Sequence, residues 1–470
     1  MAMARIFWCR RNGAFCRNVG IYPLRCLSTI VTDSICELAA SNLRFGPGAT
    51  REVGQDLAEG FGAQRVVVFT DPTVRSLPPM QVLQESLETN CVDYVVYDKV
   101  RVEPNEASFQ DAIRFLQNDV QRYDAVVALG GGSVLDTAKA ANLYHTMKPS
   151  DFYDYVNPPL GKGLPIPLSS KSLPPLIAIP TTAGTGSETT GVAIFDDTAT
   201  KSKTGIANRA LKPTLGIVDP DNTKTLPPRV ATYSGLDVLC HAIESFTALP
   251  STQRPRPSSP MMRPAYQGSN PISDIWSMHA LETCAEWLPR AVADPDDTTS
   301  RSTMLLASSA AGMGFGNAGV HLCHGMSYPI SSQVPSQYRC DYDSVQDHAM
   351  VPHGLSVIVG APAVFEFTGV ADPDRHALCA QVLAKARNDT THRRRHGTNT
   401  DYAGHWLADE IRRLLEILDV PLGLQQFGYT TSDVTSLVQG TLPQHRVTKI
   451  SPRPVGEEEL HKLFESAMSK

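Results

Sequence analysis

Short apolar runs alternate with amphipathic stretches over the first half of the chain. The runs RVVVFT (65–70), DYVVYD (93–98) and DAVVALG (124–130) are rich in β-branched residues, as buried strands are. Helical periodicity separates them, so the pattern predicts crossover units that build a mostly parallel sheet. The same pattern places further strands at 174–180, 191–197 and 213–220, and helices at 78–90, 106–118 and 133–145.

The pattern changes near Thr225, after which apolar residues recur at helical spacing and strand-like runs become rare. We therefore expect a domain boundary near residue 220, with an α/β domain over 33–220 and an α-helical domain over 221–470. Long helices are predicted at 230–246, 273–289, 301–314 and 403–418, and polar loops at 251–271 and 388–401.

The composition is that of a globular protein, with 42% hydrophobic and 19% charged residues in a chain of 470. The net charge of -6 gives no reason to expect nucleic-acid binding, and we predict that the three arginines at 393–395 lie in a solvated surface loop. No apolar run approaches the roughly 20 residues of a membrane span. The ten cysteines form no CxxC pair, which favours a reducing compartment over a disulfide framework.

The N-terminal segment differs from the rest of the chain. Residues 1–32 contain five arginines and no acidic residue, and their longest apolar run is short. An arginine-rich, acid-free leader is typical of a mitochondrial transit peptide. A disordered basic tail is the alternative.

Two glycine-bearing turns follow predicted strands. ALGGGSVLDTAKA (128–140) and PTTAGTGSE (180–188) each place small and hydroxyl-bearing residues where a strand ends. Such turns let backbone amides approach a phosphate, and a helix N-terminus favours its negative charge. The spacing is neither the GxGxxG fingerprint nor a P-loop, so a purely structural turn remains an alternative. Asp71, after the first strand, could bond a dinucleotide ribose or simply form a turn before Pro72.

The stretch SGLDVLCHAIES (234–245) places an acid and an imidazole on what should be a buried helix face. Asp237 and His241 are four residues apart and therefore share that face. A buried charge needs a cation or a strong hydrogen-bond network, although the spacing alone is common by chance. An acid with several imidazoles suits Fe²⁺, Zn²⁺, Mn²⁺ or Ni²⁺. Two further histidine pairs follow: His321 with His324, and His348 with His353.

These motifs together resemble those of the iron-containing (group III) alcohol dehydrogenases. GGGSVLDTAK, PTTAGTGSE, GLDVLCHAIES and VPHG occur in that family's order, and the resemblance runs from about residue 40 to the end. It implies the dehydroquinate synthase-like fold, with an N-terminal α/β dinucleotide-binding domain and an all-α C-terminal domain. The metal would lie in the cleft between the two domains.

The resemblance also implies the site residues. A divalent metal, Fe²⁺ or Zn²⁺, and a tightly bound NAD(H) would be the cofactors. The implied metal ligands are Asp237, His241, His324 and His353, and these would be catalytic together with Tyr328. The implied cofactor-binding residues are Asp71, Gly131, Gly132, Ser133, Asp136, Thr181, Thr182, Thr185 and Lys203.

The chain departs from the family pattern at Tyr328. Many members carry HxxxH, and here the position four residues after His324 is a tyrosine. A phenol does not exchange protons near neutral pH as an imidazole does, so a proton relay here would work differently. The segment 331–350 lengthens the spacing to His353 and is interpreted as an inserted loop.

Within the family, the closest resemblance is to members that exchange hydride between a hydroxyacid and an oxoacid. It implies oxidation of 4-hydroxybutyrate to succinate semialdehyde, coupled to reduction of 2-oxoglutarate to 2-hydroxyglutarate through a retained cofactor. It also implies the mitochondrial matrix, a homo-oligomer, and no nucleic-acid or membrane partner. Both substrates are carboxylates, so the cleft should hold a cation, for which Arg263 on the proline-rich loop is a candidate. An anchored structural role for that loop is the alternative.

Three other functions fit parts of the sequence. An ordinary NAD-dependent alcohol dehydrogenase that releases NADH would need every motif described above. A dehydroquinate-synthase-like lyase would need a dense set of lysines and arginines near the ligand motifs, which the sequence does not show. A non-enzymatic protein with a relic fold would be expected to have lost a ligand, yet all four implied ligand positions are intact.

Overall fold

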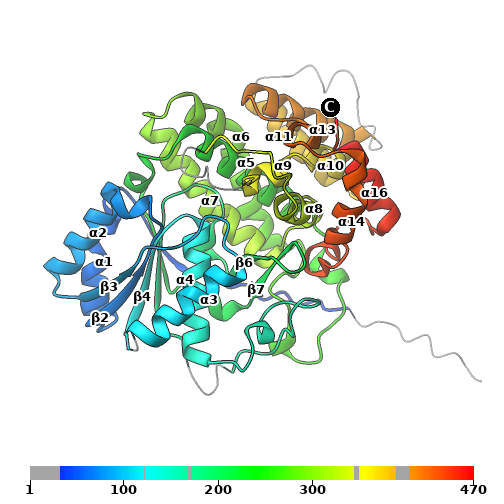
Figure 1. The fold of residues 1–470 in the computed structure, drawn as a ribbon. Helices are drawn as coiled ribbons and strands as arrows, with labels where there is room; N and C mark the ends of the chain where they lie inside the picture. The colour runs from blue at the N-terminus through cyan, green and yellow to red at the C-terminus, as the bar shows by residue number, and fades with distance from the viewer. Residues whose placement is uncertain (1–31, 121, 168–171, 343–348, 388–401, 470) are drawn as a thin grey trace, which may run out of the picture.

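The computed structural model describes residues 32–120, 122–167, 172–342, 349–387 and 402–469. Within them an α/β half and a helical half lie against one another (Figure 1). The predicted transit peptide, except Thr32, the arginines at 393–395 and His348 lie outside the described residues.

The α/β half is built on one parallel sheet. Its strand order is β1-β8-β5-β4-β2-β3, and each neighbouring pair runs parallel. Non-consecutive neighbours require crossover connections, which is what the alternation of strands and helices predicts. The strands are β1 (Asn42–Phe45), β2 (Arg65–Phe69), β3 (Asp93–Tyr97), β4 (Ala125–Gly130), β5 (Leu176–Pro180) and β8 (Leu215–Val218).

Helices cover both faces of the sheet because alternate side chains of each strand point to opposite sides. On β2, Val66 and Val68 pack with the short α1 (Val53–Gln55) and with α2 (Pro78–Thr89). Val67 and Phe69 point the other way, into the core formed with α3 (Glu106–Phe115) and α4 (Gly132–Met147). The predicted helices at 78–90, 106–118 and 133–145 are confirmed, and after Phe115 the chain continues from α3 into a π-helical turn at Leu116–Val120.

The strand predicted at 191–197 does not join the main sheet. It forms β6 (Val192–Asp197), which pairs antiparallel with β7 (Ser202–Ala207) in a separate two-stranded sheet. The sequence SKTGIA of β7 mixes lysine, glycine and hydroxyl residues, so its apolar pattern is too weak to indicate a strand. The four-residue edge strand β1 gives an equally weak signal.

The helical half is arranged around α5 (Pro228–Thr247), whose residues 235–247 are all buried. The four predicted long helices appear as α5, α6 (Pro271–Ala293), α7 (Thr298–Ala318) and α13 (Ala403–Ile417), while 251–270 carries only short 3-10 turns. No helix in the described part of the chain is both long and apolar enough to cross a membrane. The remaining helices are α8 (Leu322–Ser332), α9 (His353–Ile358), α10 (Ala361–Thr368), α11 (Pro373–Ala386), α14 (Val434–Thr441), α15 (His445–Thr448) and α16 (Glu457–Ser466).

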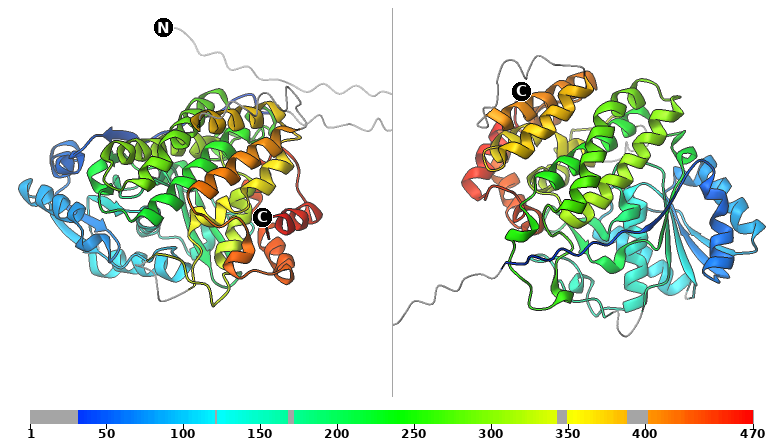
Figure 2. Two further views of the ribbon diagram at one scale, coloured as in Figure 1. Left: turned by 90° about the horizontal axis from the view of Figure 1, so that it is seen from above. Right: turned by 180° about the vertical axis from the view of Figure 1, so that it is seen from behind.

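Residues 33–41 form an extended N-terminal strap that crosses the helical half before the chain enters β1 (Figure 2, right). The amide of Gln267 bonds both the N–H and the carbonyl of Glu37, at 2.9 and 2.6 Å. The amide of Asn317 does the same for Ala39, at 3.1 and 3.2 Å. Side-chain amides thus supply the partners that a neighbouring strand would otherwise offer.

Two glycines let the halves touch backbone to backbone. Gly186 has a left-handed φ of 55°, and a Cβ there would lie 2.6 Å from the carbonyl oxygen of Ser308 on α7. A Cβ on Gly312, one turn along α7, would lie 2.7 Å from the carbonyl oxygen of Gly186. Neither backbone atom can move aside as a flexible side chain can, so this contact fixes α7 against the 180–188 turn.

We expect Gly312→Ala to lower the free energy of unfolding by about 1–3 kcal/mol, because the added methyl overpacks this contact. The loss should appear although alanine favours helix formation over glycine. Thermal unfolding followed by circular dichroism measures it. The matched control is Gly60→Ala, where a Cβ meets nothing within 4 Å. Equal stability of the two variants would contradict the argument.

Candidate metal and nucleotide site

One face of α5 carries three polar side chains in a buried environment. Asp237, His241 and Glu244 are spaced four and three residues apart, which stacks them along one side of the helix. All three are at most 4% exposed. Ordinary amphipathic packing would place apolar residues at these buried positions. Three polar side chains there indicate a functional site on this face of the helix.

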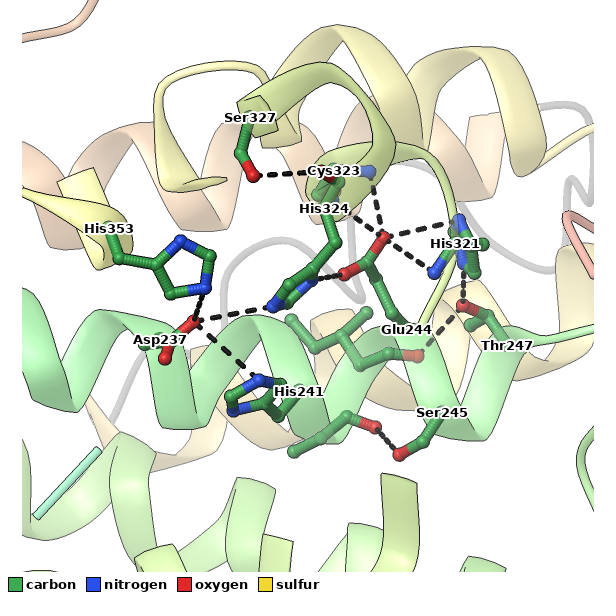
Figure 3. Close-up of polar contacts among 12 residues, drawn as sticks. Asp237, His241, Glu244, Ser245, Thr247, His321, Cys323, His324, Ser327 and His353 are labelled. Carbon is green, nitrogen blue, oxygen red and sulfur yellow. Dashed lines mark hydrogen bonds and ion pairs between the residues drawn. The ribbon is translucent and has the colours of Figure 1, made fainter. Parts of the chain in front are cut away.

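Three imidazoles surround the Asp237 carboxylate (Figure 3). Its Oδ1 lies 3.4 Å from Nε2 of His324 on α8 and 3.7 Å from Nε2 of His241. Nε2 of His353, at the start of α9, is also 3.7 Å away. Asp237, His241 and His324 each offer a ligand atom within 4.8 Å of the others, and His353 stands outside this group of three.

The donor atoms at this centre lack hydrogen-bond partners. Asp237 Oδ1 and His324 Nε2 are both buried without one among the described residues. A buried carboxylate oxygen that faces imidazole nitrogens at these distances is costly unless a cation lies among them. One carboxylate oxygen with imidazole nitrogens is a donor set for a divalent transition metal, so these residues fit such an ion.

Glu244 orients His324 from the side opposite Asp237. Its Oε2 accepts a hydrogen bond from Nδ1 of His324, and its Oε1 accepts from the backbone N–H groups of His321 (3.0 Å) and Cys323 (2.7 Å). A carboxylate only accepts, so Nδ1 carries a proton and Nε2 is the ring atom left to face Asp237. Such partners of metal-binding histidines fix the tautomer and the ring orientation.

Burial and charge set the protonation of the group. Burial lowers the pKa of His241 to about 3, although Asp237 opposes that shift, and burial also lowers the pKa of His353. Neutral imidazoles have the lone pairs that a metal needs. For His324 burial acts the same way, but Glu244 and Asp237 outweigh it and raise its pKa well above the usual value. The two carboxylates that favour a proton on His324 would also favour a metal cation in place of that proton at Nε2.

Close packing brings His353 and His241 into place. A Cβ on Gly354 would collide with the backbone oxygen of Tyr233, so only glycine lets the start of α9 approach α5 this closely. The ring of Phe315 on α7 stacks on His241, with centroids 3.9 Å apart and planes 8° apart. These contacts restrict both rings before any ligand binds.

The two glycine-bearing turns meet at the carboxyl edge of the sheet. β4 and β5 are neighbours, so the turns that follow them lie side by side. α4 begins directly after β4, and no side chain caps its N-terminus, which leaves its first N–H groups for an anion. All six predicted cofactor-binding residues of these turns line the shared cavity, namely Gly131, Gly132, Ser133, Thr181, Thr182 and Thr185.

Two predicted cofactor residues also have structural partners. Asp71 lines the cavity, and its Oδ1 accepts hydrogen bonds from the N–H groups of Thr73 and Val74, both at 2.9 Å. Its turn-forming role and a role toward a ribose are therefore compatible. Asp136 lies behind the turn, where its carboxylate accepts from Ser187 (2.7 Å) and from the N–H of Ile194 (3.0 Å). That geometry makes it a support for the turns.

Lys203 on β7 enters the same cavity as a neutralised cation. It pairs with Glu103 and, at 3.3 Å, with Asp196. Burial alone would lower its pKa, but the two carboxylates raise the pKa of Lys203 above the usual value. Glu103 has a left-handed φ of 53°, and a strained non-glycine residue of this kind is common near functional sites.

One cavity of about 800 Å³ joins the metal ligands to the nucleotide turns. That volume is in the range of small-molecule and cofactor sites. Tyr328 and Arg446 line it beside His324. Of the two roles considered for Arg263, the structure supports the anchoring one: Arg263 does not line the cavity, and it pairs instead with Asp33 (3.1 Å) and Glu37 (3.5 Å) of the N-terminal strap.

Several residues of the site were not predicted from sequence. Glu244 had a signal, since it follows His241 by three residues and therefore shares its helix face. Glu103, Tyr266, Phe315 and Arg446 had none, because they come from separate elements that only the fold brings together. Single aromatic and charged residues outside a motif look like ordinary core or surface positions.

Comparison with known proteins gives consistent matches. The family described as "Iron-containing alcohol dehydrogenase" matches residues 40–220, and "Fe-containing alcohol dehydrogenase family, C-terminal" matches residues 265–468. A Bos taurus protein named "Hydroxyacid-oxoacid transhydrogenase, mitochondrial" is 55% identical over 438 residues, 93% of this chain and 91% of that relative. The Homo sapiens protein of the same name is 54% identical and covers 93% of this chain and 90% of its own length.

Solved structures share the fold. The structure of a 1,3-propanediol oxidoreductase is 25% identical with a TM-score of 0.76, covering 92% of this chain and 100% of that chain. A sulfoacetaldehyde reductase from Bifidobacterium kashiwanohense, solved with NAD⁺, is 23% identical with a TM-score of 0.70 and covers 93% and 100%. Both align over nearly the whole of the present chain.

We expect Glu244→Gln to weaken metal affinity by about 10- to 100-fold, because an amide no longer holds the His324 tautomer as a carboxylate does. Competition of the metal-loaded protein with a chelator measures this. The matched control is Glu188→Gln. Burial raises the pKa of Glu188, and its carboxyl bonds Ser309 away from the ligands. Equal metal affinity of the two variants would show that Glu244 does not orient the ligand.

Proposed function

The chain belongs to the iron-containing alcohol dehydrogenase family, and from this membership we propose that it exchanges hydride between a hydroxyacid and an oxoacid in mitochondria. As a family member it is an oxidoreductase that acts on alcohol or carbonyl groups. The observation that carries the proposal is the 54–55% identity, over 93% of the chain, to relatives named as mitochondrial transhydrogenases of this class.

The residues of the site support two cofactors. Asp237, His241, His324 and His353 would hold Fe²⁺ or Zn²⁺, and the two glycine-bearing turns would hold the pyrophosphate of NAD(H). When bound, the metal would polarise the substrate oxygen and the nicotinamide would accept and return hydride.

The protein's own residues prepare that chemistry. Burial keeps the imidazoles of His241 and His353 neutral, so their lone pairs are available. Phe315 and the close approach at Gly354 hold two ligand rings in position. The lining of the cavity is largely apolar, and such surroundings strengthen polar interactions at the reacting group.

We propose 4-hydroxybutyrate as the donor and 2-oxoglutarate as the acceptor. Oxidation of the alcohol to succinate semialdehyde gives one hydride to the nicotinamide and releases one proton. Reduction of the keto group to 2-hydroxyglutarate takes up one hydride and one proton. The two half-reactions balance, so the net reaction consumes neither free cofactor nor protons, and a retained nicotinamide can serve both.

Mitochondrial location, in the matrix, and homo-oligomeric assembly complete the proposal. The relatives above are named mitochondrial, and the arginine-rich residues 1–32 agree with import into that compartment. The second candidate function is an ordinary dehydrogenase that releases NADH, because the same turns and ligands would serve it.

The decisive assay supplies both substrates and no NAD. The purified protein is freed of loose nucleotide by gel filtration and mixed with 4-hydroxybutyrate and 2-oxoglutarate. We expect many molecules of 2-hydroxyglutarate per enzyme, quantified by mass spectrometry, because the retained nicotinamide shuttles hydride. Omission of either substrate is the control and should leave at most one turnover.

A requirement for added NAD would overturn the proposal. Product only after NAD is supplied, with NADH accumulating in the presence of an alcohol alone, would identify an ordinary dehydrogenase. In that case the metal and nucleotide residues would keep their roles, and the transhydrogenase assignment would be withdrawn.

A further inference from the structure

A guanidinium group lies in the cavity next to the metal ligands and has no acidic partner in the described part of the chain. Arg446, on the short helix α15 near the C-terminus, lines the cavity together with His324 and Tyr328. Its Nη2 donates a hydrogen bond of 2.7 Å to the hydroxyl of Tyr328. Its Nη1 is buried and has no hydrogen-bond partner among the described residues.

Aromatic contacts fix the orientation of this group. The guanidinium carbon lies 4.7 Å from the ring centre of Tyr266, a cation–π contact, while Tyr328 holds the group from α8. A planar guanidinium that is held at one edge and one face presents its remaining N–H groups in a fixed direction. It is therefore organised to bind before any ligand arrives.

The other cations that line the cavity are already neutralised. Lys203 pairs with Glu103 and Asp196. Arg229 pairs with Asp341 and Asp419, each at 3.0 Å. Among the described cavity residues, Arg446 is thus the cation without a carboxylate partner. A buried guanidinium in this state is stabilised by an anion from outside the protein.

The position of Arg446 suits substrates with a distal carboxylate. Tyr328 follows His324 by four residues on α8, so the residue that holds Arg446 stands a little more than one helical turn, a rise of about 6 Å, along the helix from the metal ligand. In 4-hydroxybutyrate, three carbon–carbon bonds separate the reacting carbon from the carboxylate carbon. The same three bonds separate the keto carbon of 2-oxoglutarate from its distal carboxylate carbon.

We propose that Arg446 is the carboxylate-binding residue shared by the donor and the acceptor. This assignment rests on the proposed function. One fixed cation at one distance from the reacting carbon accepts both substrates in turn, so a single cavity can complete both half-reactions. An alcohol without a carboxylate lacks this contact and leaves the guanidinium unpaired, which costs affinity.

The test measures how fast each of two donors reduces the nicotinamide of the holoenzyme in a single turnover, followed by NADH fluorescence. 4-Hydroxybutyrate and butan-1-ol differ only in the distal group. Arg446→Gln should lower the rate-constant ratio of 4-hydroxybutyrate to butan-1-ol by about 30-fold or more, because truncating one partner of a buried charged pair is this costly. Arg446→Lys should have a ratio between those of Arg446→Gln and the wild type, since lysine keeps the positive charge but lacks the paired N–H donors that bind a carboxylate with two hydrogen bonds.

Arg453→Gln is the matched control. Arg453 also lies over an aromatic ring, 4.1 Å from the centre of Phe367, but does not line the cavity. We expect the ratio of the rate constants for 4-hydroxybutyrate and butan-1-ol in this variant to equal that of the wild type. Circular dichroism and metal content of the same samples report whether each variant is folded and loaded.

The outcomes separate this assignment from the proposed function. Suppose that the wild-type protein prefers 4-hydroxybutyrate and that the Arg446→Gln variant keeps this preference. That result overturns the role of Arg446 and leaves the proposed function standing. Equal losses for both donors in that variant would also overturn the role of Arg446, because they mean a structural role. A wild-type protein that prefers butan-1-ol overturns the proposed substrates, and this assignment with them.

Discussion

The burial of the Asp237 carboxylate is the constraint on which the rest of the site depends. A carboxylate that is 2% exposed requires positive charge nearby, and three imidazoles from α5, α8 and α9 face it. Glu244 buries a second negative charge seven residues along the same helix. Two such anions about two helical turns apart repel each other unless cations lie between and around them, which makes the helical half a scaffold for a metal.

The fold could be predicted largely from hydrophobic pattern. Runs such as VVVF and VVAL are unmistakable because parallel strands are buried on both faces. The errors have physical causes. β7 contains Lys203, whose side chain lies in the cavity and pairs with a carboxylate there. A polar residue at a buried strand position breaks the apolar pattern by which strands are predicted. The pattern predicts the strand at 191–197 but not its pairing with β7, because strand pairing is a long-range property that a local pattern does not contain.

The site was predictable where its residues share a helix or a turn. Asp237 and His241 are recognisable by spacing, and the glycine turns by composition. Arg446 and Arg263 show the opposite case. Both are arginines in proline-containing segments, yet one enters the cavity and the other pairs with Asp33. Sequence does not state which acid lies opposite a given arginine, and that single fact decides between a structural and a ligand-binding role.

The N-terminal strap has a consequence for the order of folding. During synthesis residues 33–41 emerge early, but the groups that hold them, at Arg254, Gln267 and Asn317, emerge more than two hundred residues later. The edge strand β1 pairs with β8, so it also waits for a late segment. The first part of the domain to leave the ribosome, or to cross a membrane during import, is therefore among the last to dock. Until then its unpaired backbone groups are open to non-native contacts. The α/β half can therefore be completed only after the helical half has folded.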